Sequence, residues 1–561
     1  MVTPTINNEF PPKNRAPSIN RGATVAPRFI EGAKPIPFVR EFPIIGSIPQ
    51  FLGDRLDFQL RLVQELGDVC GFHIGPVPVI VFNQPEYVHA LLVEHASDFD
   101  KGRVMHKAFT GNGLFISEGE FHRKQRKLMA PSFQPRLIAS YADTMVSYGE
   151  KLQQTWSDGE VIDLNQTMIS VTMSIIGKVL FDADVFTETD ELGTAMATIF
   201  ENVTHTLTSL FVPPLSWPTP RNRRTQKAAQ VLNERIQQMI DERRHTDALN
   251  RADCHPERSE GEGSVSMGRE MLSAAKHDSS DAINRADCHP ERSEGSVSIG
   301  REMLRGVYPR AQRRAQHDSS DAINRAPCLG DRYPTRNDFL SILLRAKDED
   351  GSGMSDQQLM DECITLFGAG HETTAATLTW AWYLLCQHTA LYEKVQQEVD
   401  SVLQGRTPTY ADLANLPYCL QVFKETMRLY PPATGVMREA LHDVEIDDYR
   451  VPKGANVVVP IYTLHRNPRY FPEPETFDPD RFLPEREKEL PRYAYLPFGA
   501  GPRICIGNYF AMMEGHLLIA TLAQRATFFL VPNQVIAPDL TKTLALRPYG
   551  KVEAVVKRRV W

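Results

Sequence analysis

The chain has 561 residues, of which 24% are charged, and a formal net charge of -8. Such a length suits several domains or one large enzyme, and the mild negative charge gives no sign of nucleic-acid binding or of an acidic substrate. The eight cysteines are scattered singly without a CxxC pair, which argues against a disulfide scaffold or a zinc ribbon and favours the cytoplasm. Residues 1–29 hold no apolar run, so we predict neither a signal peptide nor a transmembrane anchor.

The patterning along the chain predicts a mainly α fold with minor β. Residues 1–36 are rich in Pro, Asn and Arg and are predicted to be a disordered tail, and the proline-rich stretch 34–51 is expected to hold no helix. Residues 68–84 alternate and are β-branched, which predicts two strands turning at a Gly-Pro pair. Helical patterns dominate 86–244, and strand-like pieces return near 449–466 and at the C-terminus.

Residues 243–326 differ from the rest of the chain. "NRADCHPERSEG" occurs at 250 and at 284, and "HDSSDAINRA" occurs at 277 and at 317. The segment has few large apolar residues, so it cannot bury enough surface to offset its ordering entropy. We predict a disordered insertion in a surface loop, which a folded core tolerates because loop-closure entropy grows slowly with length.

Two alternatives for this segment stay open. A helical repeat would need an apolar signature that the segment lacks. A zinc site would use Cys-His pairs, although adjacent Cys and His are not the usual ligand spacing. Its ligands would be Cys254, His255, Cys288 and His289.

The stretch "FGAGPRICIGN", Phe498 to Asn508, surrounds one cysteine with residues that have small side chains. Cys505 could form a disulfide, act as a nucleophile, bind a metal or have no special role. Arg503 precedes it and a helical pattern follows it, which favours a thiolate because cations and helix N-termini stabilise negative charge. The glycines allow tight turns and a close approach by something large and flat. A thiolate ligand to haem iron fits these features best.

The gap-free pattern F-x-x-G-x-R-x-C-x-G closely resembles the cytochrome P450 family, the haem-thiolate monooxygenases, and the resemblance covers about 37–242 and 327–561. It implies the triangular α-rich prism with small β-sheets of that family, as a single domain over 37–561 interrupted at about 243–326. It also implies haem b, with Cys505 as the metal ligand. The predicted loop contacts to the cofactor are Phe498, Gly499, Gly501 and Arg503.

A second motif, "AGHETT", places Glu372 and Thr373 inside a long apolar helical pattern. The pair could be an N-cap or a satisfied buried polar pair. Burying a carboxyl and a hydroxyl in such a helix costs free energy, however, so we expect the pair to have a function. The resemblance supplies one, because in the family this acid–alcohol pair is catalytic and delivers protons for oxygen activation.

Two further motifs are assigned to folding and cofactor retention. "KETMRLYPP" places Glu425 and Arg428 at i, i+3 on one helix face, which by itself is an ordinary helix ion pair. "FDPDRF" contains Arg481. By resemblance the three residues form a structural triad behind the haem.

The resemblance also predicts partners for the haem propionates, although each arginine could instead be a surface charge. Arg126 and Arg438 match two of these positions, and Arg–carboxylate contacts are strong. His122 stands where the family commonly has Trp, so its contact with the haem is a weaker expectation. The predicted walls of the substrate pocket, also from resemblance, are Phe367, Ala369, Ala433, Thr434, Val436 and Leu544.

These observations predict a haem-thiolate monooxygenase that inserts one atom of O2 into an apolar organic substrate. NAD(P)H would supply electrons through separate proteins, a ferredoxin or flavodoxin and its reductase, because no flavin, iron–sulfur or Rossmann signature is present. The predicted enzyme is a cytoplasmic monomer that binds no nucleic acid. A peroxide-using or isomerising haem enzyme and a non-catalytic haem protein are the alternatives, and neither would need Glu372 and Thr373.

Overall fold

The computed structural model describes residues 34–39, 42, 44–109, 111–183, 189–209, 212–252, 338–541 and 543–559. The chain divides into two units, Met1–Gln237 with Asp331–Trp561, and Gln238–Gly330. The second unit is described only over 238–252, the end of one long helix. The predicted zinc set, Cys254, His255, Cys288 and His289, lies outside the described residues.

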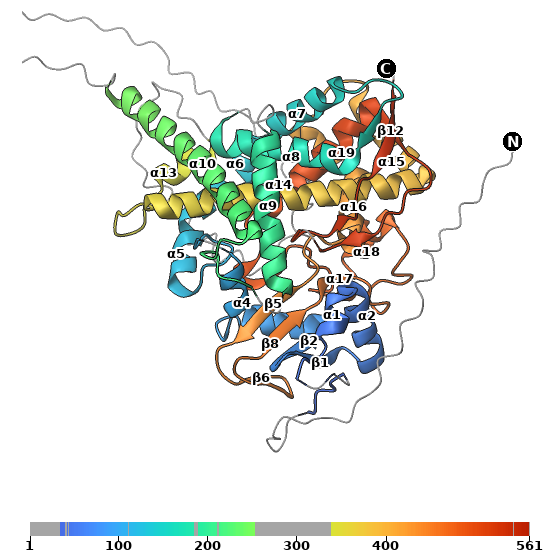
Figure 1. Ribbon diagram of the computed structural model, residues 1–561. Helices are drawn as coiled ribbons and strands as arrows, with labels where there is room; N and C mark the ends of the chain where they lie inside the picture. The colour runs from blue at the N-terminus through green and yellow to red at the C-terminus, as the bar shows by residue number, and fades with distance from the viewer. Residues whose placement is uncertain are drawn as a thin grey trace, which may run out of the picture. The chain divides into compact units, whose positions relative to one another are not determined.

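Helices form most of the first unit, as the patterning predicts (Figure 1). The helices of the N-terminal half are α1 (Ile48–Leu52), α2 (Arg55–Leu66), α3 (Pro85–His89), η1 (Ala90–Glu94), α4 (Gly102–Ala108), α5 (Gly119–Met129), η2 (Ala130–Phe133), α6 (Pro135–Ala139), α7 (Ala142–Gln154), α8 (Leu164–Phe181), α9 (Thr189–Thr208) and α10 (Pro220–Ala252). Those of the C-terminal half are α13 (Phe339–Arg345), α14 (Asp356–Gln387), α15 (Thr389–Leu403), η3 (Tyr410–Asn415), α16 (Pro417–Leu429), α17 (Ile461–Leu464), η4 (Pro479–Phe482), α18 (Pro484–Glu487), η5 (Gly501–Arg503) and α19 (Asn508–Arg525).

Helix α14 is the central element of the helical part and runs across it in Figure 1. Ser355 caps its first turn in a capping box with Gln358, so two of the free N–H groups of the helix start are satisfied. Helix α8 packs along α14, and α16 and α19 also contact it. The polar residues of "AGHETT" are therefore held in a helix that other helices enclose.

The strands form small sheets. They are β1 (Val69–Ile74), β2 (Val77–Phe82), β3 (Phe99–Asp100), β4 (Val161–Asp163), β5 (Val436–Ala440), β6 (Val444–Ile446), β7 (Tyr449–Val451), β8 (Asn456–Val459), β9 (Ala526–Leu530), β10 (Pro538–Asp539), β11 (Arg547–Pro548) and β12 (Glu553–Arg558). The largest sheet has the order β1-β2-β8-β5-β3, in which only β2 and β8 are parallel. Strands β1 and β2 form the predicted hairpin, with Gly75 at φ +60° in its turn.

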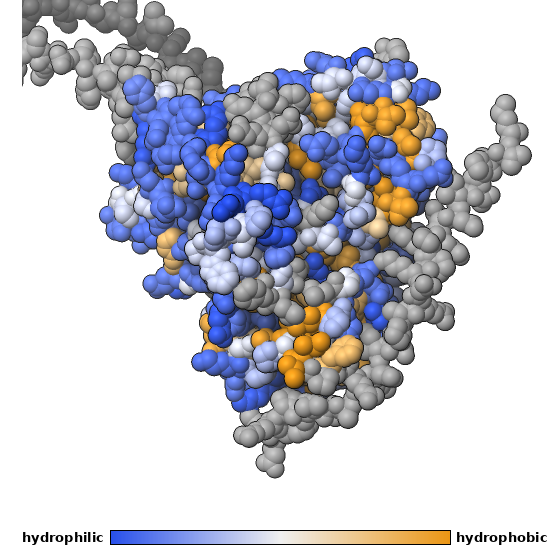
Figure 2. Space-filling model, viewed as in Figure 1, coloured by the Kyte–Doolittle hydropathy of each residue, from blue (hydrophilic) through white to orange (hydrophobic). Residues whose placement is uncertain are grey.

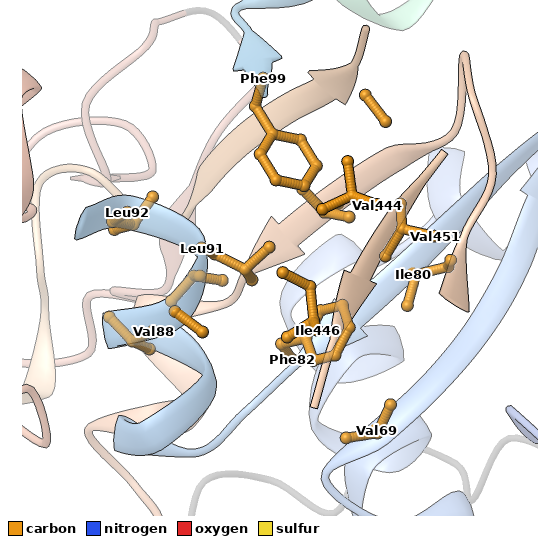
Figure 3. Packing of buried hydrophobic residues seen from close by; sticks show 14 of the residues in the cluster. Val69, Ile80, Phe82, Val88, Leu91, Leu92, Phe99, Val444, Ile446 and Val451 are labelled. Atoms are coloured by element: carbon orange, nitrogen blue, oxygen red, sulfur yellow. The ribbon is translucent and has the colours of Figure 1, made fainter. Parts of the chain in front are cut away.

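An apolar cluster joins this sheet to the chain that follows β2 (Figure 3). Phe82 of β2 and Val88, Leu91 and Leu92 of the α3–η1 segment belong to it, together with Phe99. Ala500 also belongs to the cluster, so this packing fixes the segment that leads to Cys505. The face in Figure 2 is largely hydrophilic over α9 and α10 and shows apolar side chains over the sheet.

The structure corrects three expectations about the chain's organisation. Residues 34–36 belong to the folded unit and not to the tail, because Lys34 N–H donates to Asp448 O at 2.8 Å and Ile36 packs on the core. The proline-rich lead-in does hold a helix, α1, because Pro49 lies in its first turn, where no N–H is needed. Helix α10 continues to Ala252, past the predicted start of the insertion at Arg243.

One described helix, α8, is long and apolar enough to cross a membrane by length and composition. About two thirds of it, 67%, is buried inside the protein, where it packs along α14. A core helix of a folded domain has these properties.

Candidate active site

The loop around Cys505 is shaped by glycine and by the following helix. Gly499 and Gly501 both have φ +70°, and a Cβ on Gly501 would lie 1.7 Å from Leu92 O, so only glycine fits there. Cys505 N–H donates to Phe498 O at 3.0 Å, which closes the loop. Helix α19 begins three residues later, at Asn508. The thiol therefore sits at the entrance to a long helix, as the motif predicts.

Cys505 is deep in the fold, yet its side chain has an exposed surface. Burial raises the pKa of the thiol, while the Gly507 N–H and the charge of Arg126 lower it. The sulfur is therefore surrounded by protein and still has surface that a ligand can reach.

The cation near this sulfur differs from the expected one. Arg503 donates to Ser117 O at 2.7 Å and pairs with Glu118, so its charge is used on the α5 side of the loop. Arg126, one turn after His122 on α5, supplies the positive field at the sulfur instead. Arg503 is the last residue of the short η5 turn, and its guanidinium pairs with Glu118.

The predicted propionate partners make no ion pair with a carboxylate among the described residues, although the charge of Asp100 acts on Arg438. Neither the Arg126 guanidinium nor the His122 ring has a hydrogen-bond or ion-pair partner among the described residues, and Arg438 bonds only the carbonyl of Met437, at 2.8 Å. Burial lowers the pKa of Arg438 to about 10. Burial, with the charges of Arg126, Lys101 and Arg438, lowers the pKa of His122 to about 4, so the imidazole is neutral.

Lys101 is a further member of this group that the sequence did not reveal. Burial and the charges of Arg438 and Arg503 lower its pKa well below the usual range. Its ammonium bonds Phe115 O and lies 4.0 Å from the centre of the Phe115 ring. Buried cations that repel one another need an anionic partner. The residues around Cys505 therefore fit haem, whose iron takes a thiolate and whose two carboxylates take cations.

On α14 the acid and the alcohol have different surroundings. Thr373 is exposed, and its hydroxyl donates to Ala369 O at 3.1 Å, one turn earlier on the same face. Glu372 is buried, and burial raises the pKa of its carboxyl to about 7, against opposing effects from Arg547 and Thr543. The acid can therefore gain and lose a proton near neutral pH.

Two of the predicted pocket segments lie side by side. Leu546 N–H donates to Pro432 O at 2.9 Å, which brings the segment of Leu544 beside the segment of Ala433, Thr434 and Val436. The Trp380 indole N–H donates to Leu546 O at 2.9 Å and ties both segments to α14, the helix of Ala369. Phe367 lies two residues before Ala369 on α14, so the two side chains face different sides of the helix. Its ring is 1% exposed and packs against Phe181 of α8.

The structure also brings the three residues of the predicted triad together. The Arg428 Nε and one terminal nitrogen donate to the two oxygens of Glu425 at 2.7 Å each, with both side chains fully buried. Arg481 Nε lies 3.4 Å from the same carboxylate. Arg428 also donates to His465 O and Pro474 O, so the triad joins α16 to the segment before η4.

The comparisons with known proteins agree with this geometry. The family model described as Cytochrome P450 matches residues 36–260 and 311–553, and so leaves out 261–310, inside the predicted insertion. Cyclooctatin synthase of Streptomyces melanosporofaciens is 31% identical over 86% of this chain and 87% of its own. Pentalenene oxygenase of Streptomyces avermitilis is 27% identical over 90% of this chain and 93% of its own.

A solved structure shows the same fold. The retinoic acid-bound cyanobacterial CYP120A1 superimposes with a TM-score of 0.71 at 23% identity, over 93% of this chain and 99% of the other. Together with the family match over most of the described chain, these likenesses show that the chain belongs to the cytochrome P450 family and is a haem-dependent monooxygenase.

Proposed function

We propose that this enzyme inserts one atom of O2 into an apolar terpenoid or lipid, with electrons from NAD(P)H that arrive through a separate ferredoxin or flavodoxin and its reductase. The observation that carries the proposal is Cys505, an accessible thiol in a glycine loop at the start of α19, where Arg126 and the Gly507 N–H both favour the negative sulfur. Haem, when bound, would supply the oxygen-activating redox chemistry.

The chain's own residues would hold the cofactor and manage protons. Cys505 would bind its iron, with the Gly507 N–H and Arg126 stabilising the negative sulfur. Arg438, Lys101 and the neutral His122 would hold its carboxylates. Glu372, poised near neutral pH, would supply protons, and the exposed Thr373 hydroxyl would pass them on.

The substrate class rests on the pocket and on the relatives' names. Ala369, Ala433, Val436 and Leu544 are small or apolar, so they favour a hydrocarbon surface. Relatives include a cyclooctat-9-en-7-ol 5-monooxygenase, a pentalenene oxygenase and a leukotriene-B4 omega-hydroxylase, whose names all describe largely hydrocarbon substrates. A cytoplasmic location and a monomeric state stay predictions.

The test uses purified holoenzyme, a surrogate ferredoxin with its reductase, NADPH and O2, and a panel of terpene hydrocarbons, terpene alcohols and fatty acids. We expect an oxygenated product whose new oxygen comes from O2. We also expect a red-shifted Soret band when the chemically reduced enzyme binds carbon monoxide. Cys505→Ala should lose that band, whereas the control Cys386→Ala should keep it. Product formed only with added peroxide, or a band retained in Cys505→Ala, would overturn the proposal.

A further inference from the structure

The segment before the last strand forms a hairpin that contacts α14 at Glu372. Strands β10 and β11 pair with Asp539 opposite Arg547. The hydrogen bonds of Leu546 to Trp380 and to Pro432 fix the β11 side of the hairpin, and Arg55 of α2 donates to Leu540 O at 3.0 Å on the other side. Because both sides are tied to other elements, the hairpin can hold a side chain of α14 in a defined place.

Two hairpin residues surround the Glu372 carboxyl. Arg547 Nε lies 4.0 Å from Glu372 Oε1, and it also donates to Thr543 Oγ1 at 3.3 Å. The Thr543 hydroxyl interacts with Glu372 as well. The arginine and the threonine thus form a connected pair beside the acid, at a longer range than a tight bidentate ion pair.

The hydrogen bonds of Thr543 can be satisfied in two ways. A threonine hydroxyl has one proton to donate, and here it donates to Ala545 O at 2.8 Å. In this arrangement Thr543 can only accept from Glu372, which requires the acid to be protonated. Once Glu372 has lost its proton, the hydroxyl can turn and donate to the carboxylate, while Arg547 compensates the charge.

The other ionisable groups nearby face elsewhere. The His371 Nδ1 hydrogen-bonds Phe367 O at 2.7 Å, and burial lowers its pKa to about 4, so it is neutral. Glu514 of α19 interacts with Thr374, on the other side of the motif. Asp539 faces Arg547. Arg547 is therefore the charged group among the described residues that acts on Glu372.

We propose that Arg547 and Thr543 are positioning residues for Glu372, and that the Thr543 hydroxyl changes its partner from Ala545 O to the carboxylate each time the acid gives up its proton. This role rests on the proposed use of Glu372 as a proton donor. The proton that leaves passes to the Thr373 hydroxyl, which releases its own proton toward the predicted pocket, and water returns a proton to Glu372. Leu544, a predicted pocket residue, lies between Thr543 and Ala545, so the switch would be adjacent to the predicted pocket.

The experiment compares matched variants of the full-length holoenzyme. Arg547→Met removes the charge and Arg547→Lys keeps it, while Thr543→Val removes the hydroxyl and Thr543→Ser keeps it. The carboxyl band of Glu372, identified by its absence in Glu372→Gln, is followed by infrared spectroscopy across pH in the resting enzyme. We expect its midpoint to rise by about one pH unit or more in Arg547→Met, because an opposite charge nearby favours the ionised form. Thr543→Val should shift it in the same direction.

Turnover supplies the second readout. Product formed per NADPH should fall about tenfold in Arg547→Met and Thr543→Val, as for other groups that orient a reacting residue, with more hydrogen peroxide released. Arg547→Lys and Thr543→Ser should recover most of it. An unchanged infrared midpoint in a folded Arg547→Met, or equal coupling in all four variants, would overturn the inference. If the wild type forms no product, the proposed function fails, while the infrared titration still decides whether Arg547 and Thr543 act on Glu372.

Discussion

Two buried glutamates in this enzyme each face an arginine, but the two pairs are built differently. Glu425 and Arg428 lie one turn apart on α16, are both 0% exposed, and make two bonds of 2.7 Å. Glu372 and Arg547 come from distant parts of the chain, stand 4.0 Å apart, and their side chains are 6% and 19% exposed. The first pair makes two short hydrogen bonds, whereas the second is longer and partly exposed, so its hydrogen-bond partners can change.

The difference follows from what surrounds each carboxyl. Glu425 also accepts from Asp478 N–H at 2.9 Å, and Arg428 is satisfied by carbonyls, so neither partner can leave without exposing a buried charge. Glu372 has a threonine that can donate or accept and an arginine held back by it. We call Glu425–Arg428 the saturated pair, because both side chains have several hydrogen-bond partners and the pair stabilises the fold. We call Glu372–Arg547 the responsive pair, because its contacts can change when Glu372 gains or loses a proton.

Breaking the saturated pair should have the largest effect. Arg428→Met leaves the Glu425 carboxylate buried without its partner, which should cost about 3–5 kcal/mol of stability and most of the bound haem. Urea unfolding and haem content measure both effects. Arg481→Met is the matched control, with a smaller loss, because Arg481 touches the carboxylate at 3.4 Å and from one side. A loss below about 1 kcal/mol for Arg428→Met would place the pair among ordinary surface ion pairs.

Removing the Thr373 hydroxyl, which neighbours Glu372 on α14, should leave the fold intact. Thr373→Ala loses one bond to Ala369 O and none to the cofactor loop, so haem content and substrate binding should persist. Product formation should fall by about 10²–10⁴-fold, the usual contribution of a proton-transfer group, and NADPH should go to hydrogen peroxide. Thr377→Ala, which removes an equivalent bond to Thr373 O, is the control. A fully coupled Thr373→Ala would contradict the role of this hydroxyl in passing protons on from Glu372.

The responsive pair should also be visible in stability. Burial raises the pKa of Glu372 from an ordinary 4.5 to about 7 in the folded protein. Between these values the folded state holds a proton that the unfolded state has lost, so rising pH removes stability, by at most about 3 kcal/mol. The wild type should therefore lose stability relative to Glu372→Gln from pH 4.5 to 7. Parallel unfolding curves across this range would contradict the raised pKa.

An exposed pair should have the smallest effect. Lys127 of α5 pairs with Glu349, and the two side chains are 60% and 85% exposed. Water and salt screen such charges, so Lys127→Ala should melt within experimental error of the wild type at physiological salt. Glu349→Gln serves as the reciprocal variant. A clear drop in melting temperature for both would mean that exposure is a poor guide to the strength of these pairs.

Much of the fold was predictable because it depends on local patterns. The alternation of 68–84 gives β1 and β2, and the apolar run around "AGHETT" gives α14. The prolines of 34–51 predict no helix, yet α1 forms because a first turn tolerates Pro49. The pattern also predicts that α10 ends near 244, because the apolar face of the helix stops at Ile240 and the polar residues up to Ala252 give no periodic signal.

The sequence by itself determined which functional residues lie near one another whenever they are also neighbours along the chain. Spacing in the sequence was enough to predict three such groups. They are Cys505 in its glycine loop, Glu372 beside Thr373, and Glu425 one turn before Arg428. Only the tertiary structure decided which distant groups meet them. It set Arg126 and not Arg503 beside the sulfur, added Lys101 to the cations, turned Phe367 into the core and brought Arg547 to Glu372. A lone arginine or lysine gives no local sign of its partner, since packing between separate elements alone fixes where a long side chain ends.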